Sequence, residues 1–343
     1  MKHLLNTLYV TTQGSYLYKE GESVEVSVDN EIKLHVPIHT LSGIVCFGQV
    51  MCSPPLMGFC AEKEVTISFL SRSGRFLARV QGPVSGNVLL RREQYRRADN
   101  MEMSAEIARV IVAAKIMNCR TVLLRALRNR GNADDTNGIL EVALHLAVLL
   151  KELEQPQSLE SVRGREGEAA SRYFSIFDYL ILAQKEDFFF RGRNRRPPLD
   201  NMNALMSFVY TLLLHDVISA LETVGLDPAV GYLHRDRPGR QGLALDLMEE
   251  FRPFFADRVA LNLVNLRQII GKGFKKTETG AVIMDDDTRK AVIISYQQRK
   301  QEEILHPFLN EKVAVGLLPY VQTLLMARYL RGDLDGYPPF IWR

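Results

Sequence analysis

The chain has 343 residues, of which 46% are hydrophobic and 24% charged. This composition excludes a chain disordered throughout, and four cysteines without a C-x-x-C pair exclude a disulfide scaffold. The net charge of +3 neither favours nor excludes a nucleic-acid partner, so only the distribution of charge is informative. We expect roughly two domains in a soluble protein of a reducing compartment, with no membrane association.

The first part of the chain has the pattern of β structure. Residues 23–28 alternate between polar and apolar, which is typical of a half-buried strand. Asp29 and Asn30 then favour a turn into 32–36, so the two runs predict a hairpin. Further strands are expected at 7–11, 16–18, 43–47, 65–70 and 76–80, with a short helix at 55–63.

A polar, strongly basic stretch separates this part from the rest. Beyond it the apolar residues recur with helical spacing, beginning with Ile107, Val110 and Ile111. Helical patterns follow at 139–155, 160–182, 199–224, 243–269, 288–305 and 312–331, and a small hairpin is expected within 275–287. The sequence thus predicts an α+β protein: a small β domain over 1–88, a basic linker over 89–102 and a larger all-α domain over 103–343.

Acidic residues in one apolar helical segment are the strongest chemical signal. Asp246 precedes Glu249 and Glu250 by three and four residues, so the three carboxylates share a helix face. Their neighbours are apolar, and buried carboxylates are unfavourable unless a cation compensates them. From the spacing alone, that cation could be a divalent metal or a nearby arginine. Carboxylates with an imidazole, such as that of His234, suit Mg²⁺ or Mn²⁺ better than a structural zinc.

Arginines gather in two predicted loops. Such clusters are suited to contacts with nucleic-acid phosphates, although a single cluster is more often only a solvated face. Two clusters in a chain that also carries a carboxylate–histidine set favour a nucleic-acid partner. The first cluster runs from Arg72 to Arg97, and its candidate contacts are Arg91, Arg92, Arg96 and Arg97; the second consists of Arg191, Arg193, Arg195 and Arg196.

Four segments in a fixed order resemble one family across nearly the whole chain. They are R-G-x-E-G-x-A-A-x-x-Y-F at 163–174, R-G-R-N-R-R-P-P-L-D-N-M-N-A-L-M-S-F-V-Y-T-L-L at 191–213, G-Y-L-H at 231–234 and D-L-M-E-E-F-R-P at 246–253. Each is a weak match by itself, whereas the four in order are specific. The chain resembles CRISPR-associated protein one, the metal-dependent DNA endonuclease and integrase of spacer acquisition. Its length and its ending are similar to the type I-C branch.

The resemblance implies an assembly and a reaction. Members are homodimers with an N-terminal β domain and a C-terminal helical catalytic domain. Two such dimers flank a dimer of CRISPR-associated protein two, and CRISPR-associated protein four is a possible further partner. The complex carries a short double-stranded DNA fragment and joins its 3′-OH ends into the repeat array, in the cytoplasm of a prokaryote.

The resemblance also gives roles to single residues. The family's metal ligands map onto Glu166, His234 and Glu249, which would hold Mg²⁺ or Mn²⁺. Asp246 matches a further catalytic acid, either a second ligand or a base. Glu250 departs from the family pattern and could replace Glu249, although Glu249 has the motif position. Two other hypotheses remain: a metal-dependent DNA phosphodiesterase without a role in spacer acquisition, and a DNA-binding scaffold whose acids only form ion pairs.

Overall fold

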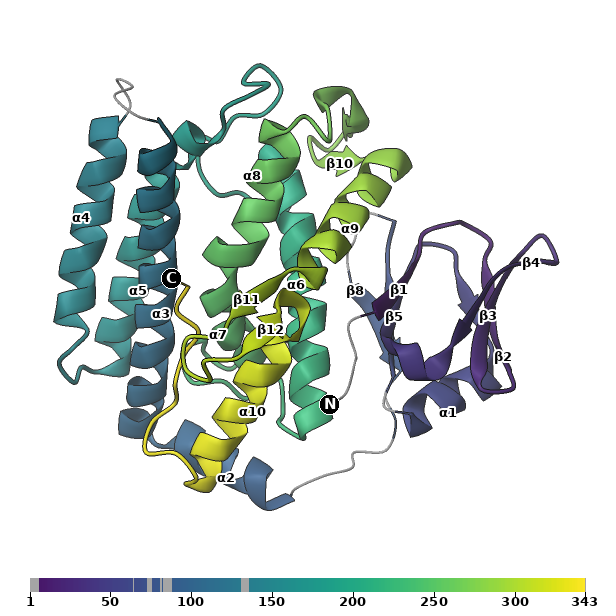
Figure 1. Cartoon of the computed structure of the whole chain (residues 1–343), viewed down its shortest axis with the longest axis horizontal. Helices are drawn as coiled ribbons and strands as arrows, with labels where there is room; N and C mark the ends of the chain where they lie inside the picture. The colour runs from purple at the N-terminus through teal and green to yellow at the C-terminus, as the bar shows by residue number, and fades with distance from the viewer. Residues whose placement is uncertain are drawn as a thin grey trace.

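A computed structural model of the protein describes residues 6–63, 65–72, 76–80, 82, 88–130 and 136–342. Strands of the N-terminal part gather on one side, and helices fill the other (Figure 1). The expected α+β class is confirmed: the N-terminal part is β-rich and the remainder is helix-rich.

Two four-stranded sheets make up the β-rich part. The first has the order β1-β5-β7-β8, in which β1, β5 and β7 are parallel and β8 is antiparallel. The second has the order β4-β3-β2-β6. The bounds are β1 Asn6–Val10, β2 Tyr16–Glu20, β3 Ser23–Val28, β4 Glu31–Pro37, η1 Ile38–Thr40, β5 Leu41–Phe47, β6 Met51–Cys52, α1 Pro54–Glu62, β7 Thr66–Leu70 and β8 Phe76–Val80.

The hairpin of β3 and β4 forms where the sequence predicts it. Asp29 and Asn30 both have positive φ angles, 52° and 64°, as a two-residue turn between twisted strands requires. The strands pair from Val28 and Glu31 outward. Turn chemistry and the alternating pattern therefore agree in this hairpin.

Helices build the larger part of the chain. Their bounds are α2 Val88–Asp99, α3 Met101–Arg130, α4 Thr136–Glu152, α5 Leu159–Ser175, η2 Phe177–Leu180, α6 Asn201–Val224, α7 Gly242–Phe251, η3 Arg252–Asp257, α8 Arg258–Asn265, η4 Gly271–Gly273, α9 Asp286–Gln301, η5 Val315–Leu317 and α10 Leu318–Arg331. Short strands pair as two hairpins, β9 (Phe274–Lys276) with β10 (Val282–Met284) and β11 (Glu303–Leu305) with β12 (Lys312–Ala314).

The stretch predicted as a basic linker is a helix instead. Helix α2 covers most of 89–102, and it buries Leu90 and Gln94. The Gln94 side chain donates to the carbonyls of Asp227 and Val230, both at 2.8 Å. Charged residues outnumber apolar residues in α2, so the sequence pattern did not reveal its one buried turn. The domain bounds themselves stay a prediction.

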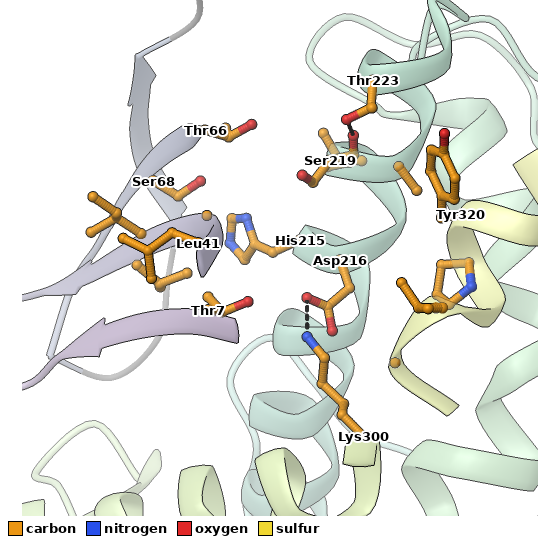
Figure 2. A pocket seen from close by; sticks show the side chains of 18 of the residues that line it. Thr7, Leu41, Thr66, Ser68, His215, Asp216, Ser219, Thr223, Lys300 and Tyr320 are labelled. Carbon is orange, nitrogen blue, oxygen red and sulfur yellow. Dashed lines mark hydrogen bonds and ion pairs between the residues drawn. The ribbon is translucent and has the colours of Figure 1, made fainter. Parts of the chain in front are cut away.

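Helix α6 is the central helix, and one of its faces meets the β-rich part. By length and hydropathy it could cross a membrane, but it is mostly buried inside the protein. A cavity of about 260 Å³ lies between it and the first sheet, with His215 and Asp216 among its walls (Figure 2). Asp216 accepts hydrogen bonds from Tyr296 at 2.7 Å and Lys300 at 2.9 Å. Asp216 therefore links α6 to α9 beside this junction.

Candidate active site

Helix α5 presents Glu166 to the interior. Its N-cap is Ser158, whose hydroxyl accepts the Ser161 N–H at 3.2 Å. Glu166 follows the buried Val162 by four residues and precedes the buried Ala169 by three, so it lies on the buried face. Its side chain is 28% exposed, which leaves the carboxylate at the edge of the interior.

Asp246 organises the loop that carries His234. The side chain is fully buried in the middle of α7. It accepts hydrogen bonds from the backbone N–H groups of Tyr232, Leu233 and His234 at 2.6, 2.9 and 3.0 Å. Its Oδ1 also lies 2.7 Å from Nδ1 of the His234 ring. Asp246 thus fixes the backbone of this loop and the orientation of the imidazole, and its oxygens are fully occupied in doing so.

Two glycines allow this close packing. A Cβ at Gly231 would lie 2.6 Å from Oδ2 of Asp246 and 2.6 Å from the carbonyl carbon of Gly242. A Cβ at Gly242 would lie 2.6 Å from the Ala229 carbonyl oxygen. The glycine of the G-Y-L-H motif is therefore needed because the loop rests directly on α7.

Glu249 is held between two cations. Its side chain is 2% exposed, with Oε2 2.7 Å from the Lys115 ammonium and Oε1 2.8 Å from the Arg252 guanidinium. Burial would raise the pKa of Glu249, but Arg252, Lys115 and His234 together hold it below its usual range. The same Lys115 ammonium contacts Oε1 of Glu166. Glu166 and Glu249, from different helices, therefore converge on one cation.

Glu250 faces away from this cluster. It accepts hydrogen bonds from the Tyr337 hydroxyl at 2.8 Å, the Phe340 N–H at 2.8 Å and the Gln322 amide at 3.1 Å. Burial raises its pKa to about 8, although these hydrogen bonds oppose the shift. Of the two adjacent acids, Glu249 therefore lies beside Glu166, and Glu250 binds the C-terminal segment.

The donor set is suited to a divalent cation. Glu166 and Glu249 already share a positive charge, and the bond from Asp246 to Nδ1 leaves Nε2 of His234 for a ligand, as in many metal-bound histidines. Within the described ranges, no three His, Cys, Asp or Glu side chains stand close enough together to hold a metal. The chemical types of these residues are therefore those that bind Mg²⁺ or Mn²⁺. In this structure the Lys115 ammonium contacts both carboxylates.

A groove of about 710 Å³ opens beside Glu166 and Lys115. Its walls include Arg191, Arg193 and Arg195 from the loop before α6. Arg191 and Arg195 are at least partly exposed, as is Arg196 next to them. A groove lined by the Glu166 carboxylate and by accessible arginines has the charge pattern of a nucleic-acid channel.

Arg193 belongs to the scaffold of this loop. It donates to the Asn203 side chain at 2.7 Å and to the Ser207 hydroxyl at 3.1 Å, and it stacks over the Tyr210 ring. Burial lowers its pKa. Its guanidinium therefore holds the loop on α6.

The arginines of α2 also include both structural and accessible side chains. Arg97 bonds Glu93 at 3.0 Å and stacks over the Tyr329 ring, and Arg96 lies 3.7 Å from Glu93. Arg92 is exposed and Arg91 is partly buried. Arg97 is thus held in place, whereas Arg91, Arg92 and the 66% exposed Arg96 are better placed to contact a ligand.

Sequence reasoning missed one carboxylate that lines the groove. Asp257 is buried and accepts hydrogen bonds from Tyr210 at 2.5 Å and Tyr173 at 3.1 Å. Burial raises its pKa to about 6, although the two tyrosines and nearby arginines oppose the shift. It ends the π-helical turn η3, which the spacing pattern could not show.

Lys115 was also missed, although the sequence carries a sign of its role: this lysine lies one turn after Ile111 and interrupts an apolar stripe.

The comparisons with known proteins agree with these features. A family model described as CRISPR associated protein Cas1 matches residues 8–298. A Chlorobaculum tepidum protein named CRISPR-associated endonuclease Cas1 1 is 57% identical over the full length of both chains. A Geobacter sulfurreducens protein named CRISPR-associated exonuclease Cas4/endonuclease Cas1 fusion is 33% identical over 98% of this chain and 60% of its own.

Solved structures share the fold. A CAS1 protein from Thermotoga maritima aligns with a TM-score of 0.82 and 26% identity, over 98% of this chain and 100% of its own. A chain of a Cas6-RT-Cas1–Cas2 complex aligns with a TM-score of 0.81 and 22% identity, over 98% of this chain and 36% of its own. A helical protein with a small β-rich part and a carboxylate–histidine site is the class that the structure defines. The chain belongs to the Cas1 family.

Proposed function

We propose that this protein is the metal-dependent DNA endonuclease and integrase of CRISPR adaptation, which joins the 3′-OH ends of short DNA fragments into a repeat array. The relatives above are named as endonucleases, and the family membership supports the integrase role. The observation that carries the proposal is the convergence of Glu166 and Glu249 on one cation beside the arginine-lined groove.

Glu166, His234 and Glu249 would hold Mg²⁺ or Mn²⁺. A bound divalent cation would polarise the scissile phosphate and stabilise the attacking and leaving oxygens. Asp246 acts through His234, because it sets the ring orientation and leaves Nε2 free. The catalytic role predicted for Asp246 therefore becomes a positioning role in this proposal.

The arginines would hold DNA by its backbone. Arg191 and Arg195 are accessible in the groove that Glu166 lines, Arg196 is exposed next to them in the sequence, and guanidinium groups pair well with phosphates. Arg91 and Arg92 would extend the contact along α2. Such contacts position a duplex and read little sequence, so a fragment of any sequence could be carried.

The partners follow from the family and from one exposed strand. β4 is an edge strand of the second sheet, and Ile32 and Leu34 on it are 58% and 43% exposed. We propose that this edge lies in a homodimer interface, because an uncovered apolar edge strand promotes association. We further propose complexes with Cas2 and Cas4, a cytoplasmic location in a prokaryote and membership of the type I-C branch.

A strand-transfer assay tests the proposal. Purified protein with Cas2, a short duplex and a plasmid that carries a repeat should join the 3′-OH ends in Mg²⁺ or Mn²⁺, and EDTA should stop the reaction. Glu166→Ala, His234→Ala and Glu249→Ala should each abolish it while DNA binding persists. Cleavage without joining would favour the phosphodiesterase hypothesis. Full DNA binding without any metal-dependent reaction would favour the scaffold.

A further inference from the structure

Lys115 occupies the point where two proposed metal ligands meet. Its side chain extends from α3 and is only 8% exposed. The ammonium contacts Oε1 of Glu166 and lies 2.7 Å from Oε2 of Glu249. The lysine is therefore the shared counterion of both acids.

The cluster is electrically complete without a metal. The carboxylates of Glu166 and Glu249 carry two negative charges, and Lys115 and Arg252 supply two positive ones. A divalent cation added to this neutral set would meet the Lys115 ammonium at short range. Like charges repel strongly at such distances in a protein interior, so the metal and the ammonium cannot both lie between the two acids.

Of the two cations, Lys115 is the one able to move. Arg252 is fixed by its ion pair with Glu249 and by the Tyr210 ring below it, 5.1 Å from the guanidinium carbon. Lys115 has a flexible four-carbon stem with a compact charge at its end. Both cations line the groove, which gives the ammonium polar space to enter, but only Lys115 contacts both acids, so its withdrawal is the one that would free them.

We propose that Lys115 is a built-in competitor of the divalent cation: it holds Glu166 and Glu249 together in the metal-free protein and leaves them for the groove when the metal binds. The inference rests on the proposed metal-dependent function. Withdrawal of the ammonium would let Glu166, Glu249 and His234 close to ligand distance. It would also place a positive charge in the groove, where a DNA phosphate would be bound.

Metal affinity tests the competition. Titration calorimetry with Mn²⁺ would compare the full-length wild type with Lys115→Met, Lys115→Arg and Lys290→Met. Lys115→Met removes the charge at similar length, so it should bind Mn²⁺ about tenfold more tightly or better. Lys115→Arg keeps the charge and should bind no more tightly than the wild type. Lys290 is exposed on α9, so Lys290→Met should equal the wild type.

Opposite results would overturn the inference. Equal or weaker binding by Lys115→Met would make the lysine a partner of the bound metal rather than its competitor. Tighter binding by Lys115→Arg would show that charge is not what competes. If the wild type binds Mn²⁺ and transfers strands, such results leave the proposed function standing. A wild type that binds no divalent cation would contradict both the proposed metal-dependent function and the inference about Lys115.

Thermal unfolding gives a second readout. In EDTA, Lys115→Met should unfold at a lower temperature than the wild type, because two carboxylates lose their shared counterion. Mn²⁺ should raise the unfolding temperature more in Lys115→Met than in the wild type, and a higher unfolding temperature in EDTA would contradict the inference. If Lys115→Met folds only with metal, it would be purified in Mn²⁺ and titrated with EDTA. It should then release Mn²⁺ at a higher EDTA concentration than the wild type, and release at a lower one would overturn the inference.

Discussion

The ring of His234 takes its orientation from Asp246. Oδ1 of Asp246 lies 2.7 Å from Nδ1 of His234, and the same carboxylate accepts three backbone N–H groups of the loop. A single buried acid therefore sets both the path of the G-Y-L-H segment and the nitrogen that faces a ligand. Removing the acid should affect the loop and the imidazole together.

Asp246→Asn should lower both stability and activity. An amide has one acceptor oxygen, so at least one of the loop donors loses its partner, and the free energy of unfolding should fall by about 1–3 kcal/mol. Metal-dependent strand transfer should fall well below the wild-type rate, because the ring of His234 is no longer fixed. Urea unfolding and a strand-transfer assay measure the two effects.

Tyr232→Phe is the matched control for this loop. The Tyr232 hydroxyl is buried and has no hydrogen-bond partner among the described residues. Its removal should leave stability unchanged or slightly higher, with activity retained. An Asp246→Asn protein as active as Tyr232→Phe would refute the positioning role.

The sequence predicted the burial of α7 but not the partners of its acids. Spacing put Asp246, Glu249 and Glu250 on one face, and all three are buried. Their partners nevertheless differ, because α7 is enclosed on every side. Asp246 binds the loop that carries His234, Glu249 contacts a lysine of α3, and Glu250 binds the C-terminal segment. These partners are far away in the sequence, so they are set by tertiary packing. The local spacing of apolar residues carries no information about them.

Other differences have equally physical causes. The helix α2 escaped notice because its charged residues outnumber the two that it buries. The patterns at 288–305 and 312–331 extend into β11 and β12, since three-residue strands are too short to show a period of two. Lys115 was overlooked because a cation inside an apolar stripe gains meaning only from the acids of other helices.

Removal of the accessible arginines should weaken DNA binding for all sequences alike. Arg191→Ala, Arg195→Ala and Arg196→Ala combined should reduce the slope of log affinity against log salt by about 0.9 for each phosphate that the protein no longer neutralises. Arg331→Ala, at the exposed end of α10, is the control and should keep the wild-type slope. Fluorescence anisotropy with a labelled duplex at several salt concentrations gives the slopes. Equal slopes in both variants would reduce this loop to a solvated surface.

Charges on the β4 edge should produce a monomer. Ile32→Asp with Leu34→Asp places two carboxylates where we propose a self-association interface, and like charges would then face each other or stay buried without partners. Light scattering should show half the wild-type mass with an unchanged circular dichroism spectrum. Leu144→Asp on α4, where Leu144 is 57% exposed, should keep the wild-type mass. A wild type that is already monomeric at micromolar concentration would contradict the proposed dimer.

Glu250 should make the protein less stable as pH rises. Burial raises its pKa from 4.5 to about 8 in the folded protein, against the opposing hydrogen bonds of Phe340, Tyr337 and Gln322. The folded chain therefore holds a proton that the unfolded chain releases. The stability contribution of this carboxyl is complete below about pH 4.5 and is lost as the pH rises through about 8.

Glu250→Gln isolates this contribution, because the amide has the same shape and does not titrate. Urea unfolding at about pH 5 and about pH 8.5 should show a smaller loss of stability in Glu250→Gln than in the wild type. Glu250→Ala should instead be less stable at both values, by about 3 kcal/mol or more, because three buried donors lose their acceptor. Both variants keep Glu166 and Glu249, so Glu250→Gln should retain strand transfer. An inactive but stably folded Glu250→Gln protein would move the catalytic assignment from Glu249 to its neighbour.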